Sequence, residues 1–299
     1  MSWLDRQSFL GDDSDEILAA LTVGIVGLGG GGSHVAQQLA HVGVGNFVLV
    51  DPDIITDTNL NRLVGGTRAD VEAGTPKIDI AQRVIVGVNP NAKVEKRFSL
   101  WQDAAESLKE CDVIIAGVDK TRAKHELDAF SRRLMIPYID MGMDVIQTRG
   151  NNYLIAGQVI LTGPGEPCLQ CLGIVTESLL KEEAQNYGDA GSKPQVVWPN
   201  GLLSSTAVGL FMQLVTPWSD QSSASAFLEY DGNRHVMIEA GVLKLCKKRP
   251  CSHYRTGDVG DPRFDMRKLL ANRTCTHPES SSWWRKMRLW ILRKIWKAA

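Results

Sequence analysis

The sequence lacks any run of about eighteen apolar residues, the length that a membrane-spanning helix requires. Its first sixteen residues, MSWLDRQSFLGDDSDE, also lack the basic and apolar segments of a secretion signal. We therefore expect a cytoplasmic protein that no helix anchors across a membrane.

The sequence also has little net charge and few cysteines. The 299 residues carry a formal net charge of -1, which argues against a general affinity for nucleic acid. Six cysteines are too few for a disulfide scaffold in a chain of this length, so their spacing carries more information than their number. Apolar residues make up 43% of the chain, which is enough for a sizeable core.

Strand-like and helix-like segments alternate as far as residue 143. The β-branched runs suit strands that are buried on both faces of a parallel sheet, and the alternation predicts a doubly wound, Rossmann-like α/β fold. The expected strands are 22–27, 46–51, 93–99, 111–119 and 136–143, and the expected helices are 33–42, 77–88, 101–110 and 121–134.

The pattern changes after these segments. Residues 148–163 predict a hairpin that turns at 150–152, and residues 227–239 predict a second one that turns on Asp231–Gly232. These strands would extend the mostly parallel sheet with antiparallel ones. Residues 186–200 have the composition of a crossover loop, and 255–282 read as a polar linker. The main domain is expected to span 1–254.

A glycine-rich run follows the first expected strand. It reads GLGGGGSHVA, which fits G-x-G-x-x-G at Gly27, Gly29 and Gly32, and Gly30 makes it G-x-G-G-x-G. Backbone N–H groups in such a turn can approach a phosphate at the positive end of a helix. Ser33 would be the N-cap of that helix. The run alone suits a nicotinamide or flavin dehydrogenase as well as an ATP enzyme.

Polar residues after the next strands favour ATP. Asp51 closes the second strand, where a carboxylate can accept from ribose hydroxyls. Its loop, DPDIITDTNLNR, also carries Asp53, Asn59 and Arg62, and Lys77 begins the following helix. Asn59, Arg62 and Lys77 are amide and cationic groups that can orient and neutralise triphosphate oxygens. Asp119 follows the fourth strand and is expected to meet Asp51 at the same crevice, together with the residues just named.

With these motifs the chain resembles the ThiF/MoeB/HesA/ubiquitin-activating-enzyme superfamily from about Trp3 to Tyr254. The resemblance rests on the G-x-G-G-x-G run, on DPDIITDTNLNR, on GVDKTR and on the N-terminal segment LDRQSFLG. It implies ATP, Mg²⁺, a homodimer and adenylation of a carboxyl terminus.

The resemblance also implies roles for individual residues. Asp51 would hold the ribose, and Asn59, Arg62 and Lys77 would grip the triphosphate. Asp119 would bind Mg²⁺ beside the α-phosphate, and Arg6 would reach the partner subunit's site as an arginine finger. Two departures from the family pattern are Leu63, where Gln is frequent, and Lys120, where Asn is usual. Lys120 could assist phosphate binding or weaken the metal site.

Two pairs of cysteines predict a structural zinc site. Cys168 and Cys171 form CLQC, and Cys246 and Cys251 form CKKRPC. Paired thiolates at short spacing suit tetrahedral Zn²⁺, and relatives with two such pairs support this interpretation. Because the second spacing is wide, His253 could replace one ligand.

Relatives that carry a ubiquitin-like protein onward often place a nucleophilic cysteine after the first zinc pair. Residues 172–245 contain no cysteine. The enzyme would therefore stop at the acyl-adenylate, use a cysteine elsewhere, or have lost one by substitution. Cys275 is the candidate nucleophile outside the zinc pairs, although an idle exposed thiol explains it as well.

The last segment, 283–299, reads WWRKMRLWILRKIWKAA and has six basic residues and no acidic one. Its apolar residues recur at helical spacing, so we expect a basic amphipathic helix. A peripheral membrane surface or an acidic partner would suit it, as would docking on the chain's own body, which carries a formal charge of -7 without this segment.

We therefore expect an enzyme that uses Mg–ATP to adenylate the C-terminal tail of a ubiquitin-like or sulfur-carrier protein, releasing pyrophosphate. A conjugating enzyme is a further expected partner. The alternatives are superfamily adenylation of a small carboxylate, peptide or tRNA base, a nucleotide-binding module without activity, and a nicotinamide dehydrogenase.

Overall fold

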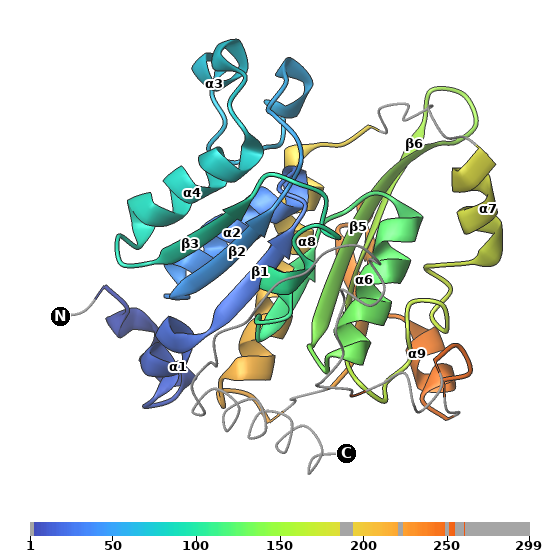
Figure 1. The fold of residues 1–299 in the computed structure, drawn as a ribbon. Helices are drawn as coiled ribbons and strands as arrows, with labels where there is room; N and C mark the ends of the chain where they lie inside the picture. Colours follow the sequence, from blue (N-terminus) through green and yellow to red (C-terminus); the bar gives the residue numbers. More distant parts are fainter. Residues whose placement is uncertain (1–2, 186–193, 221–223, 249–250, 255–259, 261–299) are drawn as a thin grey trace.

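The computed structural model describes residues 3–185, 194–220, 224–248, 251–254 and 260. One eight-stranded sheet runs through the molecule in the order β3-β2-β1-β4-β5-β6-β7-β8 (Figure 1). Its strands are β1 (Thr22–Val26), β2 (Asn46–Val50), β3 (Lys93–Arg97), β4 (Val113–Ala116), β5 (Tyr138–Gln147), β6 (Tyr153–Thr162), β7 (Ala226–Asp231) and β8 (Val236–Glu239).

The first five strands pair in parallel, and the last three are antiparallel additions. Strands β1, β2 and β4 are almost wholly buried, which explains their continuous apolar runs. The predicted doubly wound fold with an antiparallel extension is confirmed. Both predicted hairpins form, β5 with β6 and β7 with β8. The first turns around 150–152 as expected, although its first strand is β5 itself, and the second turns at 232–235, directly after Asp231.

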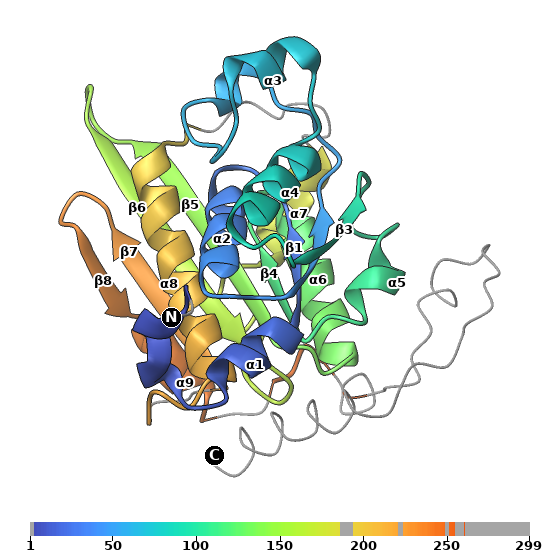
Figure 2. The ribbon, with the colours of Figure 1, turned by 90° about the vertical axis from the view of Figure 1, so that its left-hand side faces the viewer.

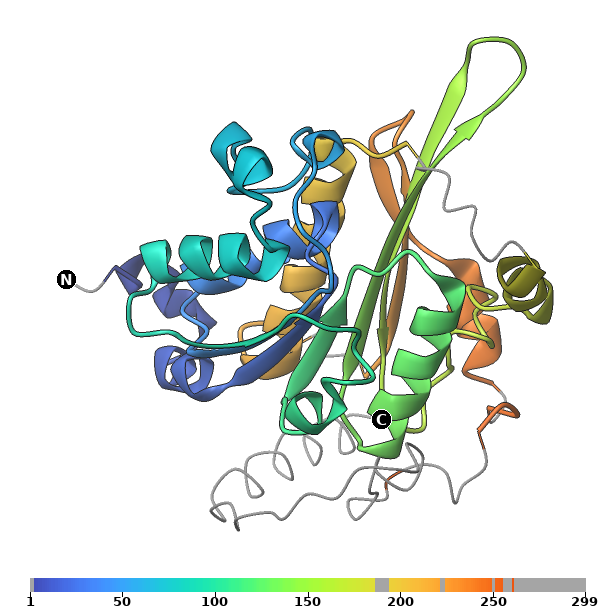
Figure 3. The same cartoon turned by 45° about the horizontal axis from the view of Figure 1, so that its top comes forward.

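Helices cover both faces of the sheet (Figures 2 and 3). The helices α2, α4 and α8 share one apolar core with α1, and α5, α6 and α9 contribute to the other. The helical segments are η1 (Asp5–Leu10), α1 (Ser14–Ala20), α2 (Gly30–His41), η2 (Asp57–Asn59), α3 (Arg68–Ala73), α4 (Lys77–Val88), α5 (Ala105–Leu108), α6 (Thr121–Arg133), α7 (Glu177–Gln185), α8 (Val197–Val215) and α9 (Gly241–Cys246). Within the described residues, no helix is long and apolar enough to cross a bilayer.

Three local expectations were wrong. Helix α2 begins at Gly30, so Ser33 lies inside its first turn, where its hydroxyl donates to the Gly30 carbonyl at 3.1 Å. The helix expected at 101–110 is shortened to α5. The expected loop 186–200 includes the start of α8, whose Pro199 and Asn200 resemble loop residues but are buried in its first turn. Residues 186–193 lie outside the described part.

The two ends of the sheet differ in what they carry. The glycine-rich run, Asp51 and Gly117 follow the carboxyl ends of β1, β2 and β4, which lie side by side in the sheet. The segments η1 and α1 lie at the amino ends, where the Gly45 amide donates to the Leu18 carbonyl just before β2. Open α/β sheets bind ligands at the carboxyl ends of the strands, which makes that edge the candidate site.

Candidate nucleotide crevice and metal centre

Two glycines of the predicted loop allow close packing at its base. Gly27 has a φ of 83°, and a Cβ there would lie 2.8 Å from the Gly117 carbonyl oxygen. A Cβ on Gly32 would lie 1.8 Å from the Gly27 carbonyl oxygen. The loops after β1 and β4 therefore meet through backbone atoms, and any side chain at Gly32 would force helix and strand apart.

The other two glycines face different surroundings. A Cβ on Gly29 would meet no heavy atom of the described chain within 4 Å, so this position borders open space at the start of α2. A Cβ on Gly30 would lie 2.5 Å from Nδ2 of Asn200, in the first turn of α8. The first N–H groups of α2 lack intrahelical acceptors and can receive a phosphate beside Gly29.

Asp51 is buried behind the loop, 4% exposed, and both of its carboxylate oxygens are engaged. One accepts from the Leu28 amide at 2.6 Å and the other from the Asp53 amide at 2.8 Å. Burial raises the pKa of Asp51, while Lys77 and the two amides act in the opposite direction. The carboxylate therefore ties the glycine loop to the loop after β2, and further lone pairs can accept from a ligand.

Lys77 begins α4 and points its buried ammonium group at this cluster. Its Nζ lies 2.7 Å from Oδ2 of Asp53 and 4.0 Å from Oδ1 of Asp51. The Lys77 amide also donates to the Asp53 carbonyl at 3.0 Å. A side chain that is 9% exposed beside two carboxylates forms a fixed positive charge at the crevice.

Asn59 and Arg62 hold their own loop together in this structure. Oδ1 of Asn59 accepts from the Thr56 amide at 2.9 Å, which caps η2. Nη1 of Arg62 donates to the carbonyl of Thr58 at 2.5 Å and to Oδ1 of Asn61 at 2.9 Å. Both side chains are partly exposed. Both residues belong to the segment between β2 and α3 that begins with Asp51.

Asp119 is exposed and meets the segment that leads into α8. Its Oδ1 accepts from Nε2 of Gln195 at 3.3 Å, and the Gln195 carbonyl accepts from Nδ2 of Asn61 at 2.9 Å. Gln195 thus bridges the loop after β4 to the loop after β2. No sequence motif marks Gln195, because it lies in a segment with the composition of a loop.

Helix α6 begins two residues after Asp119 and is anchored by a buried network that sequence reasoning missed. Nζ of Lys124 lies 2.8 and 2.7 Å from the two oxygens of Asp140 and donates to the Met141 carbonyl at 2.9 Å. The Tyr138 hydroxyl donates to Asp140 at 3.0 Å. Burial raises the pKa of Asp140, and Lys124 opposes that shift. A lysine on the buried face of α6 was the one sequence feature that could have indicated this network.

Arg6 lies at the other end of the sheet. Its neighbour Gln7 donates to the Val42 carbonyl at 3.1 Å, and Val42 follows the last residue of α2. Twelve helical residues span about 18 Å, so Arg6 is separated from Gly29 by roughly the length of α2. Arg6 therefore does not join the other predicted residues within one chain.

At the predicted zinc site, three thiols and one imidazole lie close together. The sulfur atoms of Cys168, Cys171 and Cys251 are 3.6 Å apart in each pair, and Nδ1 of His253 lies 3.3 to 3.9 Å from them. A tetrahedral Zn²⁺ with Zn–S of about 2.3 Å would separate its sulfur ligands by about 3.8 Å. The four donors therefore fit a closed structural Zn²⁺ site, with a ligand atom from each residue within 4.8 Å of the others.

The expected fourth thiolate, Cys246, is not one of these donors. Its thiol donates instead to the Cys171 carbonyl at 3.2 Å. Cys246 ends α9, which fixes its direction, whereas Cys251 and His253 follow in an irregular segment. The four-cysteine assignment is corrected to three cysteines and His253, the alternative that the wide spacing left open.

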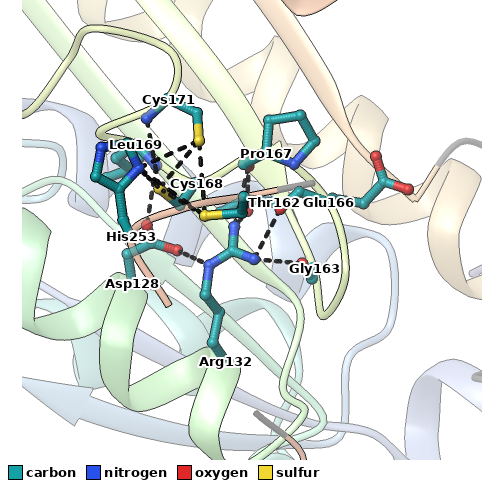
Figure 4. Close-up of polar contacts among 11 residues, drawn as sticks. Asp128, Arg132, Thr162, Gly163, Glu166, Pro167, Cys168, Leu169, Cys171 and His253 are labelled. Carbon is teal, nitrogen blue, oxygen red and sulfur yellow. Dashed lines mark hydrogen bonds and ion pairs between the residues drawn. The ribbon is translucent and has the colours of Figure 1, made fainter. Parts of the chain in front are cut away.

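Charged residues on α6 hold the loop that leads to Cys168 (Figure 4). The Arg132 guanidinium donates to the carbonyls of Gly163, Glu166 and Pro167 at 2.8 to 3.0 Å and also bonds Thr162. Its Nε lies 3.0 Å from Asp128, which accepts from the Leu169 amide at 2.9 Å.

Both Asp128 and Arg132 are almost completely buried. Burial raises the pKa of Asp128, and the Arg132 charge opposes that shift. The Tyr254 ring lies 5.4 Å from the guanidinium carbon. The far half of α6 thus supports the candidate metal site, while its first residues follow Asp119. Cys275, most of the linker 255–282 and the segment 283–299 lie outside the described residues.

Comparisons with known proteins identify the family of the chain. The ThiF family model matches residues 4–250. The chain is 29% identical over 195 residues to the molybdopterin-synthase adenylyltransferase of Escherichia coli, covering 64% of this chain and 73% of that one. It is 31% identical over 165 residues to the SAMP-activating enzyme E1 of Haloferax volcanii, covering 54% and 57%.

A third relative is the tRNA threonylcarbamoyladenosine dehydratase of Bacillus subtilis, 39% identical over 85 residues, covering 28% of this chain and 33% of that one. Among solved structures, the fold resembles Escherichia coli MccB with ATP at a TM-score of 0.63 and 19% identity, over 80% of this chain and 68% of that one. MccB in complex with N-formylated MccA gives a TM-score of 0.65 at 18% identity, over 80% and 72%.

The family model spans nearly all of the described chain and includes the glycine loop, α6 and two of the three clustered cysteines, Cys168 and Cys171. The chain therefore belongs to the ThiF family, and like the relatives named here it is an enzyme.

Proposed function

We propose that this enzyme adenylates a carboxyl terminus with ATP in the crevice at the carboxyl ends of β1, β2 and β4. One observation carries the proposal: a buried carboxylate, Asp51, and a buried ammonium group, Lys77, lie behind an open glycine position at the start of α2. This arrangement offers backbone N–H groups and a fixed positive charge to a triphosphate.

Each predicted residue has a role in this proposal. The free lone pairs of Asp51 accept from the ribose, and Gly29 lets the phosphates approach the backbone of α2. Lys77 and Arg62 neutralise phosphate oxygens, with Asn59 beside them and Asp53 holding Lys77. The Asp119 carboxylate is exposed and therefore accessible to Mg²⁺, and carboxylate oxygens suit that ion. Mg²⁺ bound there would neutralise charge on the phosphates.

The reaction needs no side-chain base, because the attacking carboxylate is already an anion. One of its oxygens forms a bond to the α-phosphorus while the bond to the β-phosphate oxygen breaks. The products are an acyl-adenylate and pyrophosphate. Positioning and charge neutralisation by Lys77 and Arg62 account for the rate.

The relatives support three candidate substrate classes. A molybdopterin-synthase adenylyltransferase and a SAMP-activating enzyme support a ubiquitin-like or sulfur-carrier protein whose C-terminal tail enters the crevice. The MccB structures with MccA favour a peptide as the second candidate, and the dehydratase relative favours a tRNA base as the third.

A homodimer would complete the site. Arg6 lies at the amino end of the sheet, too far from the crevice of its own chain, so it could act only in a second subunit. We propose this in-trans role together with the main domain 1–254. The metal site would be structural, since a closed site of three thiolates and one imidazole leaves no position for substrate.

Carboxylate-dependent exchange of labelled pyrophosphate into ATP tests the proposal. The probes are peptides that end in Gly-Gly with a free carboxylate, the same peptides as C-terminal amides, and a tRNA transcript. We expect exchange only with free carboxylates and a loss of about 10²–10³-fold in Asp119→Ala. The matched control is Glu72→Ala, an exposed acid on α3 that should exchange like the wild type. Equal activity in wild type and Asp119→Ala would overturn the assignment.

A further inference from the structure

Two exposed aromatic rings meet at the amino end of the sheet, far from the crevice. Phe9 is 68% exposed and Trp218 is 43% exposed, and their rings make an edge contact with centroids 6.4 Å apart. A Cβ on Gly11 would lie 2.8 Å from Pro217, so the segments that carry the two rings pack closely. We call Phe9, Pro217 and Trp218, with the acidic residues described next, the amino-edge patch.

Acidic side chains border these rings in the sequence. Asp12, Asp13 and Glu16 are exposed at the start of α1, and Asp220 is exposed two residues after Trp218. Residues 3–16 contain five acidic residues and one arginine. The amino-edge patch therefore combines apolar rings with negative charge, which is the surface that a basic aromatic segment requires.

The patch is separate from the nucleotide crevice. Asn200, in the first turn of α8, touches the glycine loop, whereas Trp218 follows the last turn of the same helix. Nineteen helical residues span about 28 Å, so the two surfaces lie at opposite ends of α8. A ligand on the patch would leave the crevice open.

We propose that residues 283–299 bind the amino-edge patch of their own molecule. This segment holds four tryptophans, six basic residues and no acidic residue, which complements the patch in both apolar character and charge. The proposal is independent of the proposed function.

The position of the chain before this segment supports binding within one molecule. Gly260 lies beside Met135, after the end of α6, and its amide approaches the Arg132 carbonyl at 3.4 Å. That site is also at the amino end of the sheet. The 22 residues 261–282 could span about 80 Å at most, and a tether of this length within one chain gives an effective concentration in the millimolar range. Weak affinity therefore suffices for docking.

Other occupants fit less well. A two-fold contact between copies of the patch would set acidic side chains against each other. An anionic membrane would be repelled by the same acids. The test below distinguishes both of these occupants from the proposed one.

Zero-length carbodiimide cross-linking of the full chain tests the proposal, because it joins lysines to carboxylates in direct contact. A mixture of ¹⁴N- and ¹⁵N-labelled protein separates links within one molecule from links between copies. We expect links from Lys286, Lys294 or Lys297 to Asp12, Asp13 or Asp220, all within one molecule, and fewer links as ionic strength rises. Links only between copies, or only to acids elsewhere on the body, would overturn the proposal.

Hydrogen exchange of residues 283–299 provides the second readout. We expect amide exchange in the wild type to be at least tenfold slower than in Asp12→Lys/Asp13→Lys/Asp220→Lys and in Phe9→Ser/Trp218→Ser. The matched control Glu72→Lys/Glu182→Lys reverses two exposed acids elsewhere and should keep the protection. Thermal melts establish that each variant folds. Protection that is absent in the free wild type and arises only with phosphatidylglycerol vesicles would assign the segment to membranes and refute the proposal.

Discussion

Replacing single glycines of the nucleotide loop separates packing from ligand binding. In Gly32→Ala the new Cβ would lie 1.8 Å from the Gly27 carbonyl oxygen, so helix α2 or strand β1 must move by more than 1 Å. Overpacking of this kind costs about 1–3 kcal/mol, and the backbone contact here places it at the upper end. Alanine recovers up to about 1 kcal/mol of helix propensity. A net loss of about 2 kcal/mol follows.

The complementary variant is Gly29→Ala, whose Cβ meets no described atom within 4 Å. Its stability should stay within about 0.5 kcal/mol of the wild type, because nothing in the protein is displaced. The methyl group would instead occupy the space proposed for the phosphates, so ATP affinity should fall at least tenfold.

Urea unfolding and ATP titration calorimetry measure the two effects. Gly209→Ala in α8 serves as the control, since its Cβ also meets no neighbour within 4 Å and alanine should leave stability unchanged or higher. Wild-type stability of Gly32→Ala, or wild-type ATP affinity of Gly29→Ala, would show that the loop does not work as described.

Three further predictions concern the candidate metal site and two ion pairs, Asp128–Arg132 and Asp70–Arg83. The amount of Zn²⁺ bound per chain can be measured by plasma mass spectrometry after dialysis against a chelator. We expect it to be unchanged in Cys246→Ala and lost in His253→Ala. The reverse result would restore the four-cysteine site. Arg132→Met should lower the free energy of unfolding by about 3–5 kcal/mol, because a buried carboxylate loses its partner, and urea unfolding at pH 7 checks this. Hydrogen bonding to Arg83 holds the pKa of Asp70 below its usual range, so this carboxylate stabilises the fold above pH 4 or so and loses that effect as pH falls further. The stability deficit of Asp70→Asn should therefore be largest near neutral pH and shrink in acid, and a deficit that does not change with pH would contradict it.

Much of the fold could be read from the sequence, because buried parallel strands and amphipathic helices impose strong periodicities. The strands β1, β2 and β4 are continuous apolar runs, and α4 and α6 start and end close to the expected residues. Helix α8 was missed because its apolar residues surround it almost completely, and Pro199 and Asn200 at its start resemble a loop.

The residues of the candidate site that lie in sequence motifs could be predicted, whereas those that depend on tertiary contacts could not. The glycine loop and Asp51 lie together because each follows a strand at one edge of the sheet, and Lys77 joins them because it begins the helix after the loop of β2. Gln195 and Lys124 reach the site through contacts across many residues, so no local pattern marks them. The choice of His253 over Cys246 depends on the direction of the chain after α9, which spacing alone could not decide.

The central claim is that a carboxylate attacks the α-phosphate of ATP in this crevice. The most direct test labels the C-terminal carboxylate of a Gly-Gly peptide with ¹⁸O and analyses the nucleotide product by mass spectrometry after release of the acyl group with hydroxylamine. We expect AMP that carries one ¹⁸O atom, because the attacking oxygen stays on phosphorus when the carbonyl carbon is attacked. Formation of ADP, or of AMP without the label, would contradict it.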